Sequence, residues 1–372
     1  MIYLDYAATT PLETRALEAY IQAATELGNA ASVHWAGRHA RERIEGARSQ
    51  IAEKLGIHPL EVVFNTGGTE GNNHVLLGLA LERGSGHIVS TSIEHSAILQ
   101  PLSWLQRRGI EVSFLTPDRW GRIDPEALSG LLREDTFLVS IGHTNNELGS
   151  VQDIRRCVEI AHAHGVLVHS DMVQSLGVLP IHLTDWQVDF ASFSGHKCYG
   201  PKGTGFLYVR RDVSLPPMML GGHQERGLRG GTQNVPGICA LGVAVDIAVS
   251  EQQQTHTHLS NLKSAFVQEL GRHPNIAFNH PSDGNPKVVS VTVHGVDGEA
   301  LWMNLDLEGV AASAGSACSA GTMQPSHVLL ALGLSQAEAK CSVRFSFGRT
   351  SSLQEVKSAA DAFGMAISRS VI

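Results

Sequence analysis

The sequence predicts an α/β protein with a large, mixed but mostly parallel seven-stranded sheet and a smaller α+β unit near its C-terminal end. Seven short apolar runs alternate with helical stretches as far as about residue 251, as strands and crossover helices do in such a sheet. From about Gln252 helices and strands follow a different, mixed order. A chain of 372 residues, 42% of them hydrophobic, can bury enough apolar surface to form these two units.

Each expected strand of the large sheet is a short apolar run bounded by turn-forming or polar residues. In chain order the seven strands are expected at 61–65, 87–90, 110–115, 137–141, 166–169, 189–193 and 204–209. Beyond residue 252, helices are expected at 256–271, 298–307, 326–332 and 353–369, and strands at 288–293 and 342–347.

A helix is expected over 40–55, where Ile44, Ala47, Ile51 and Leu55 recur at helical spacing. We expect these side chains to face the core. The charged residues around the rest of the helix are expected to form a solvated face, and they are Arg41, Arg43, Glu45 and Arg48.

Charge and cysteine content narrow the function classes. With 28 basic and 36 acidic residues the net charge is −8, so direct nucleic-acid binding is not expected, although a local basic patch stays possible. The five cysteines are widely spaced without a C-x-x-C, which argues against a disulfide framework or a zinc ribbon. No basic-then-apolar leader starts the chain and no apolar run approaches the ~20 residues of a membrane span, so we expect a cytoplasmic protein without a membrane partner.

An anion site is expected where the first sheet strand turns into a helix. Gly67 and Gly68 allow close backbone approach, Thr69 adds a hydroxyl, and the helix N-terminus offers free N–H groups. An ordinary strand-to-helix turn would have the same pattern. The dinucleotide fingerprint G-x-G-x-x-G is absent from this stretch.

Lys197 follows a buried strand, within the stretch Ser194-Gly195-His196-Lys197. The surrounding glycines resemble a P-loop, but Pro201 stands where a P-loop has its lysine, so we reject an NTPase. The carboxyl end of such a strand faces the ligand crevice of an open α/β sheet. Desolvation there makes a lysine amine nucleophilic enough for a Schiff base with an aldehyde. The alternative is a surface lysine in a turn.

Asp171 ends the strand before it, and Gln174 follows closely. A carboxylate at the end of an apolar strand needs a partner. Pyridoxal phosphate (PLP) requires a carboxylate for its ring nitrogen, a lysine for its aldehyde and a helix N-terminus for its phosphate. Thr69, Asp171 and Lys197 supply all three, so the sequence predicts a PLP enzyme, the alternative being unrelated polar residues at strand ends.

Cys318 lies in the stretch 311–322, which is almost entirely Ala, Ser, Gly and Thr. Such a stretch packs weakly and is expected to be mobile. A mobile loop suits a nucleophilic thiol that approaches a substrate and then moves away from it. A packed strand edge with an incidental cysteine is the alternative. No metal site is expected, because H-E-x-x-H is absent and the pairs His162/His164 and His256/His258 do not share a helix face.

These residues together resemble the group I (NifS/IscS-type) PLP-dependent cysteine desulfurases of the class-V aminotransferase family. The resemblance runs from residue 2 to about residue 365. It rests on motifs in this order: Tyr3-Leu4-Asp5-Tyr6-Ala7-Ala8-Thr9-Thr10, Gly68-Thr69-Glu70, Glu94-His95, Asn145-Asn146-Glu147-Leu148-Gly149, Asp171 with Gln174, Ser194-Gly195-His196-Lys197, Arg226-Gly227 with Arg229, Gly231 and Thr232, Gly315-Ser316-Ala317-Cys318-Ser319, and Val343-Arg344-Phe345-Ser346.

The resemblance implies PLP fold-type I, the aminotransferase-like fold. It implies an N-terminal segment, 1–15, that packs with the small domain, a large PLP-binding domain, 16–251, and a small C-terminal α+β domain, 252–372, that carries the catalytic cysteine. It also implies a homodimer.

The resemblance further implies a role for each matching residue. Lys197 would bind the cofactor covalently, and Cys318 would take the substrate sulfur as a persulfide while L-cysteine becomes L-alanine. Asn145 and Arg344 would hold the substrate carboxylate, for which the planar guanidinium is well suited. The remaining cofactor contacts would be Asp171 with the ring nitrogen, Gln174 with the phenolic oxygen, His95 stacked on the ring and moving protons, Gly68, Thr69, Ser194 and His196 with the phosphate, and Thr232 with the phosphate in the partner subunit.

Three substitutions depart from the family pattern, and one question stays open. Ala30 replaces a usual Pro, Gly230 replaces a common Ser, and Cys198 replaces a branched apolar residue beside Lys197. The sulfur acceptor stays open among iron–sulfur cluster assembly, tRNA thiolation and DNA phosphorothioation systems. The alternatives to a desulfurase are another PLP-dependent C–S or C–Se lyase, such as a selenocysteine lyase independent of Cys318, an aminotransferase, and a scaffold that needs no Lys197.

Overall fold

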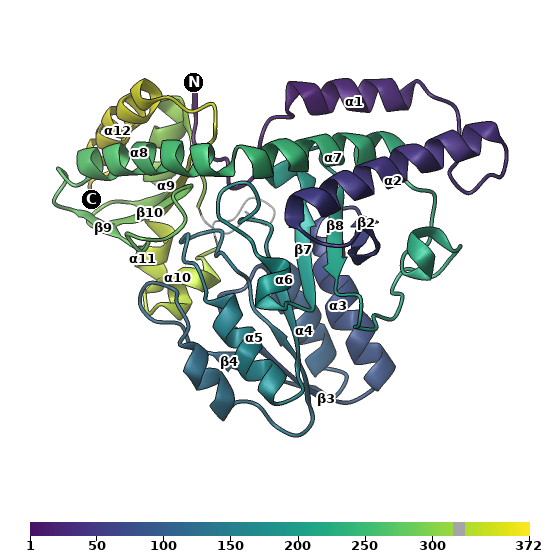
Figure 1. Cartoon of the computed structure of the whole chain (residues 1–372). Coiled ribbons are helices and arrows are strands. Elements are labelled where there is room, and N and C mark those ends of the chain that lie inside the picture. The colour runs from purple at the N-terminus through teal and green to yellow at the C-terminus, as the bar shows by residue number, and fades with distance from the viewer. Residues whose placement is uncertain (315–323) are drawn as a thin grey trace.

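A seven-stranded sheet forms the centre of the computed structural model, which describes residues 1–314 and 324–372 (Figure 1). Its strand order is β2-β8-β7-β6-β5-β3-β4, and only β8 runs antiparallel to its neighbours. The strands are β2 (Val62–Asn65), β3 (Gly86–Thr91), β4 (Ile110–Leu115), β5 (Thr136–Ser140), β6 (Leu167–Asp171), β7 (Phe190–Ser194) and β8 (Gly205–Val209). The predicted fold class and all seven predicted strands are therefore confirmed.

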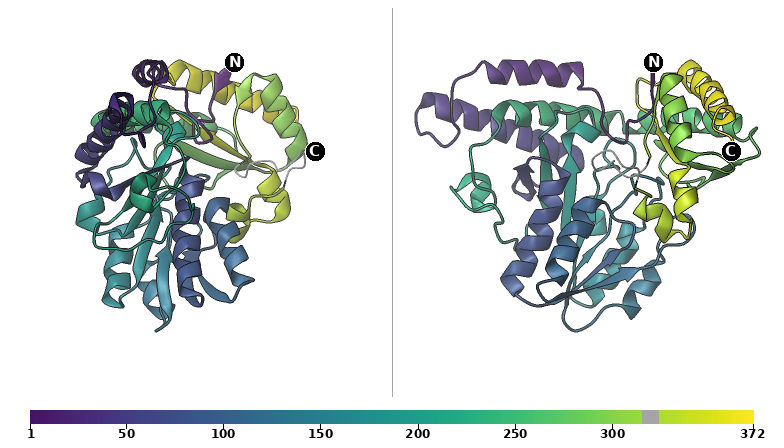
Figure 2. Two further views of the ribbon diagram at one scale, coloured as in Figure 1. Left: turned by 90° about the vertical axis from the view of Figure 1, so that its right-hand side faces the viewer. Right: turned by 180° about the vertical axis from the view of Figure 1, so that it is seen from behind.

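Helices cover both faces of this sheet. On one face α3 (Gly68–Arg83) and α4 (Ser96–Gln106) pack against a core that includes Val75 and Leu138. On the other face lie α2 (Trp35–Leu55), α5 (Ile154–Ala163), the short α6 (Leu183–Trp186) and α7 (Val235–Ser250), while α1 (Thr14–Ala24) packs outside them on α7 (Figure 2). The result is a three-layer α/β/α arrangement.

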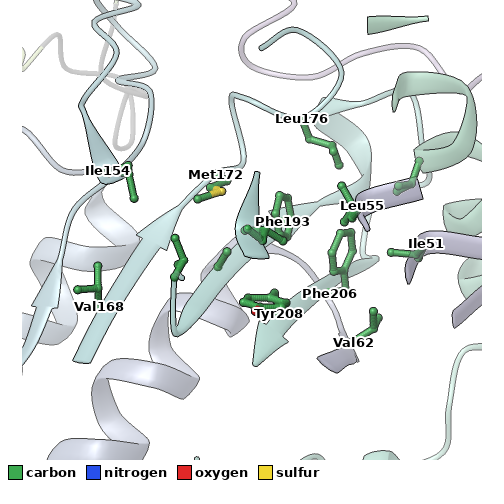
Figure 3. Packing of buried hydrophobic residues seen from close by; sticks show 14 of the residues in the cluster. Ile51, Leu55, Val62, Ile154, Val168, Met172, Leu176, Phe193, Phe206 and Tyr208 are labelled. Atoms are coloured by element: carbon green, nitrogen blue, oxygen red, sulfur yellow. The ribbon is translucent and has the colours of Figure 1, made fainter. Parts of the chain in front are cut away.

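The core beneath α2 shows why these residues form this sheet. Phe193 of β7 and Phe206 of β8 stack with ring centroids 4.5 Å apart, and Ile51 and Leu55 of α2 close over them (Figure 3). Buried on both faces, the strands consist of nearly continuous apolar residues. The packed core fixes where the strand ends lie, and the polar residues that follow those ends are thereby held in place.

Helix α2 departs from its predicted pattern at one charged residue. Arg48 was expected on the solvated face but is only 2% exposed, because it pairs with Glu225 from a loop far along the chain. The helix also begins earlier than predicted, since the His34 ring caps it by accepting from Gly37 N at 3.3 Å.

A second core lies at the C-terminal side, around the antiparallel sheet β12-β10-β9. Edge-to-face contacts join Phe266 to Phe345 and Phe347, and Phe345 to Phe363. The elements are α8 (Gln252–Leu270), β9 (Ile276–Phe278), β10 (Val288–Val293), α9 (Gly298–Leu307), α10 (His327–Ala331), α11 (Gln336–Lys340), β12 (Ser342–Ser346) and α12 (Leu353–Ser368).

The N-terminal residues join this second core. β1 (Ile2–Tyr3) pairs in parallel with β11 (Val310–Ala311), and Leu4 is fully buried in the second core. The division of the chain at residues 15 and 251 stays a prediction. No single helix of the described residues is long and apolar enough to cross a membrane, although α7 and α8, bent by 67°, would be so together on length and composition alone.

Candidate active site

A cavity of about 480 Å³ opens at the carboxyl ends of β5, β6 and β7. This is the edge at which open α/β sheets bind their ligands. The N-terminal ends of α3 and α4 line it, together with Ala7 and Ala8, and Ser313, His327 and Arg344 approach it from the C-terminal side. The cavity brings together ten of the residues singled out in the sequence: Gly68, Thr69, His95, Asn145, Asp171, Gln174, Ser194, His196, Lys197 and Arg344.

Lys197 ends the 3-10 turn Gly195–Lys197 that follows β7. Its Nζ donates to the carbonyl oxygens of Ala7 at 2.5 Å and Ala8 at 2.9 Å. Burial, reinforced by the charge of Arg344, lowers the pKa of Lys197 to about 8. A much larger share of this amine is therefore neutral near neutral pH than for an ordinary lysine, as attack on an aldehyde requires.

Asp171 at the end of β6 is held by two donors. Asn72 Nδ2 donates to its Oδ2 at 2.7 Å, and the backbone N–H of Val173 donates to its Oδ1 at 3.0 Å. Asn72 is missing from the sequence prediction. Its position in the first turns of α3, shortly after Thr69, could have indicated a role in the site, because that part of the helix faces the same crevice.

An anion cradle lies at the start of α3. The residue before the helix, Gly67, has φ 142°, a value that favours glycine, and it has no side chain to cap the first N–H groups. Gly68 approaches so closely that an added Cβ would lie 2.6 Å from Val173 Cγ2. Free N–H groups at a helix start bind phosphate well, and Thr69, Ser194 and His196 surround the same hollow.

His196 enters this hollow as a neutral group. Its Nδ1 lies 3.1 Å from Thr9 Oγ1. Burial, together with the charges of Lys197, Lys202 and Lys287, lowers the pKa of His196 to about 4. A neutral imidazole can donate a hydrogen bond to a phosphate without adding a charge.

His95 is the N-cap of α4, and its Nδ1 accepts from Ala97 N at 3.0 Å. The neutral ring therefore carries its proton on Nε2. The residue is exposed to the open cavity, yet desolvation by the surrounding protein lowers the pKa of His95. The charge of Asp171 opposes this shift, so the two groups are electrostatically linked.

Two buried carboxyl groups beside the cavity had no predicted role. Glu94 accepts from Thr91 Oγ1 at 2.7 Å and from Gly142 N, and burial raises the pKa of Glu94 to about 7. Glu147 accepts from Ser326 Oγ at 2.5 Å, and burial raises its pKa as well. The sequence motifs contain both residues, but nothing in their spacing distinguishes a wall residue from a reacting one.

The predicted substrate residues both line the cavity, one from β12 and one from the segment after β5. Arg344, on β12, donates to Asp5 Oδ1 at 2.8 Å and to Asn146 O at 3.0 Å. Its buried Nε has no partner among the described residues. Asn145 Nδ2 donates to Ile93 O at 2.8 Å, and its Oδ1 accepts two backbone N–H groups. An unpaired guanidinium nitrogen is available for a carboxylate.

The residues present fit PLP. Two buried amide oxygens, Gln174 Oε1 and Asn72 Oδ1, have no partner within the described part of the chain. Gln174 Nε2 donates to Ala7 O at 2.9 Å, which holds the side chain against the cavity wall. A lysine of lowered pKa, a positioned carboxylate and an uncapped helix start thus share one cavity, as the aldehyde, ring nitrogen and phosphate of PLP require.

The cavity lining does not include two of the predicted site residues, for different reasons. Thr232 is exposed and does not line this cavity. Cys318 lies outside the described residues. The flanking residues Ser313 and His327 both line the cavity, and Ser313 pairs through its backbone with Arg344. His327 Nε2 lies 2.9 Å from the carbonyl oxygen of Glu94, so it donates there.

Comparison with known proteins identifies the class to which this fold and site belong. Residues 2–358 match the model of the aminotransferase class-V family, and the chain belongs to that family. The family uses PLP, in agreement with the site.

Cysteine desulfurases are among the most similar relatives. The chain is 40% identical over 352 residues to cysteine desulfurase IscS of Dictyoglomus turgidum, covering 93% of this chain and 89% of that protein. Among solved structures, a NifS-like protein superposes with a TM-score of 0.92 at 35% identity, with 99% of each chain covered. SspA in complex with cysteine superposes with a TM-score of 0.83 at 36% identity, covering 93% of this chain and 99% of that one.

Proposed function

We propose that this chain is a cysteine desulfurase that converts L-cysteine to L-alanine and carries the sulfur as a persulfide on Cys318. The observation that carries the proposal is the single cavity that joins Lys197, Asp171, His95 and Arg344 and receives both flanks of the Cys318 segment. The likeness to cysteine desulfurases and to a structure that contains cysteine supports this substrate.

Bound PLP supplies the electron sink that makes loss of the Cα proton feasible. Arg344 and Asn145 hold the carboxylate of the substrate, and Asp171 keeps the ring nitrogen protonated. The Lys197 amine, whose pKa is lowered to about 8, takes the Cα proton, and His95 moves protons nearby. The Cys318 thiolate then attacks the substrate sulfur. The S–S bond forms as the C–S bond breaks, its electron pair goes to the carbon side, and protonation there completes alanine.

We assign the phosphate to Gly68, Thr69, Ser194 and His196, and the phenolic oxygen to Gln174. We further propose a homodimer in which Thr232 reaches the phosphate held by the partner subunit. The exposed position of Thr232 supports this, as do exposed apolar side chains in and near α1 and at the start of α2. They are Leu17, Tyr20, Ile21, Leu27, Val33 and Trp35.

A persulfide needs an acceptor protein, and we propose that one docks where Cys318 can reach it. Iron–sulfur cluster assembly, tRNA thiolation and DNA phosphorothioation all use such a donor. A reducing cytoplasm suits this chemistry, and the four described cysteines, Cys157, Cys198, Cys239 and Cys341, are all free.

The test is to give L-cysteine to the PLP-loaded protein and to measure alanine and the persulfide by mass spectrometry. Cys318→Ala should still bind L-cysteine, with its spectral change, but lose alanine formation. Cys198→Ala is the matched control, because burial raises the pKa of that thiol to about 11 and keeps it inert. Normal alanine formation by Cys318→Ala would reject the proposal and favour a lyase that works without Cys318.

A further inference from the structure

A buried ion pair that does not line the cavity fixes the loop that precedes Thr232. Arg48 and Glu225 are 2% and 4% exposed. Arg48 donates through Nη1 at 2.8 Å and Nη2 at 3.0 Å to the two carboxylate oxygens of Glu225. Phe64 N and Gln233 Nε2 donate to the same carboxylate at 2.9 and 2.5 Å. The charge is thus fully paired, as a buried carboxylate requires.

The backbone at this point is unusual. Glu225 has φ 46° and Arg226 has φ 60°, so two consecutive residues with a Cβ adopt the left-handed region. Such a conformation persists only where the surroundings impose it. Here it is imposed by the bonds of the Glu225 carboxylate and by Arg226 Nη2, which donates to Leu60 O at 3.0 Å and Val62 O at 3.1 Å.

A second tether holds the other end of the loop and leads to the phosphate cradle. Arg229 Nε donates to Glu70 Oε1 at 2.8 Å, and Glu70 in turn accepts from Thr66 in the turn before α3. Gly230 packs so closely on Gly221 that an added Cβ would lie 2.8 Å from the Gly221 Cα. This contact explains why glycine replaces the common serine at position 230.

We propose that Arg48 and Glu225 are positioning residues that hold loop 225–232 pre-formed, so that Thr232 meets the cofactor phosphate of a second copy of this chain. The inference rests on the proposed dimer. A buried ion pair is weak evidence for stability, since apolar residues of similar volume often serve as well. The Glu225 carboxylate accepts four hydrogen bonds and belongs to a strained loop that ends at an exposed threonine, which points to pre-organisation instead.

Because the loop acts on the other subunit, heterodimers test the proposal. In the first heterodimer Glu225→Gln and Lys197→Ala share one subunit, so the only intact Lys197 faces the altered loop. In the second, Glu225→Gln lies on the subunit with Lys197 and Lys197→Ala on its partner, so Lys197 faces an intact loop. Borohydride trapping of PLP on Lys197, quantified by mass spectrometry against PLP concentration, gives the affinity. We expect about tenfold weaker binding in the first heterodimer and none of this loss in the second.

Equal losses in both heterodimers, or a loss only in the second, would overturn the proposal. If Glu225→Gln does not fold, Gln233→Ala is used in its place. It removes one of the four bonds to the carboxylate and should give a smaller loss of PLP affinity, again only in the first heterodimer. Thr232→Ala in the same two arrangements separates the two claims. If Thr232→Ala weakens PLP binding equally in the two heterodimers, the proposed contact of Thr232 with the partner's phosphate is wrong. If Thr232→Ala gives the asymmetry and Glu225→Gln does not, only the positioning role of Glu225 is wrong. Amide exchange at 224–233 in the apo protein should be faster in Glu225→Gln, and unchanged exchange would also overturn it.

Discussion

Asn72 is the residue whose substitution best tests the geometry around Asp171. A hydrogen bond to a charged group contributes roughly 1.5–3 kcal/mol, so Asn72→Ala should weaken PLP binding by about tenfold or more. Fluorescence titration of the apo protein with PLP measures this. Asn73→Ala is the matched control, because its amide donates only to Thr69 O in the same helix. Equal losses in the two variants would contradict a specific role for Asn72.

Lys197 should reveal its lowered pKa in the rate at which apo protein takes up PLP. Only the neutral amine attacks the aldehyde, so the rate should rise with pH and level off above about 8 rather than near 10.5. The charge of Arg344 contributes to the lowering, so Arg344→Gln should move the midpoint to higher pH. Stopped-flow absorbance across pH 6.5–10 measures both. An unchanged or lower midpoint in Arg344→Gln would disprove this electrostatic link.

Three of the site residues can be predicted from the order of strands and helices alone. Asp171 ends β6, while Thr69 and Lys197 come soon after the ends of β2 and β7, and the topology of an α/β sheet places such ends on one edge. Strand ends do not predict Asn72, Ser313 or His327. Asn72 lies within a helix, and Ser313 and His327 reach the cavity through packing between distant segments, which no local sequence pattern encodes.

At the scale of elements, the close approach of helix α3 to the end of β6 is what forms the anion cradle. An added methyl group at Gly68 would lie 2.6 Å from Val173 Cγ2, closer than real contacts allow. Gly68→Ala should therefore shift the helix start and weaken PLP binding by about tenfold or more, as a misplaced set of phosphate donors does.

A second substitution distinguishes this crowding from a general helix effect. Val173→Ala removes the methyl groups in the way, so the double variant Gly68→Ala/Val173→Ala should recover most of the affinity. Gly46→Ala in the exposed middle of α2, where nothing lies within 4 Å, should instead raise the free energy of unfolding by about 0.5–1 kcal/mol. Failure of Val173→Ala to rescue would show that the clash is not the cause.

Elements of different length were unequally predictable. The seven long strands show as apolar runs, whereas β1 and β11, of two residues each, and β9, of three, are too short to show a pattern. Helix α2 shows the converse limit. Arg48 lies four residues after Ile44 and three before Ile51, so helical spacing itself puts it beside the core stripe, and the prediction of a solvated position was wrong. What the spacing cannot reveal is its partner, because the carboxylate of Glu225 comes from a distant loop.

At the scale of the whole molecule, buried histidines link folding to pH. Burial lowers the pKa values of His143, His169 and His280 to about 4, well below the usual 6.5. Between pH 6.5 and 4 the unfolded chain therefore binds protons that the folded protein does not bind. Stability from these groups is complete above pH 6.5 and is lost as the pH falls. Glu94, with its pKa raised to about 7, acts in the opposite direction over pH 7 to 4.5.

The three histidines outnumber the opposing buried carboxyl groups Glu94 and Glu147, so the apo protein should lose stability steadily between pH 6.5 and 4.5. Urea unfolding at half-unit pH intervals measures the slope. Glu94→Gln removes one opposing group while its amide oxygen can still accept from Thr91, so the slope should become steeper. His169→Asn removes one buried imidazole and should make the slope shallower, whatever its effect on stability at pH 7. Slopes that stay unchanged in both variants would show that other groups control acid unfolding.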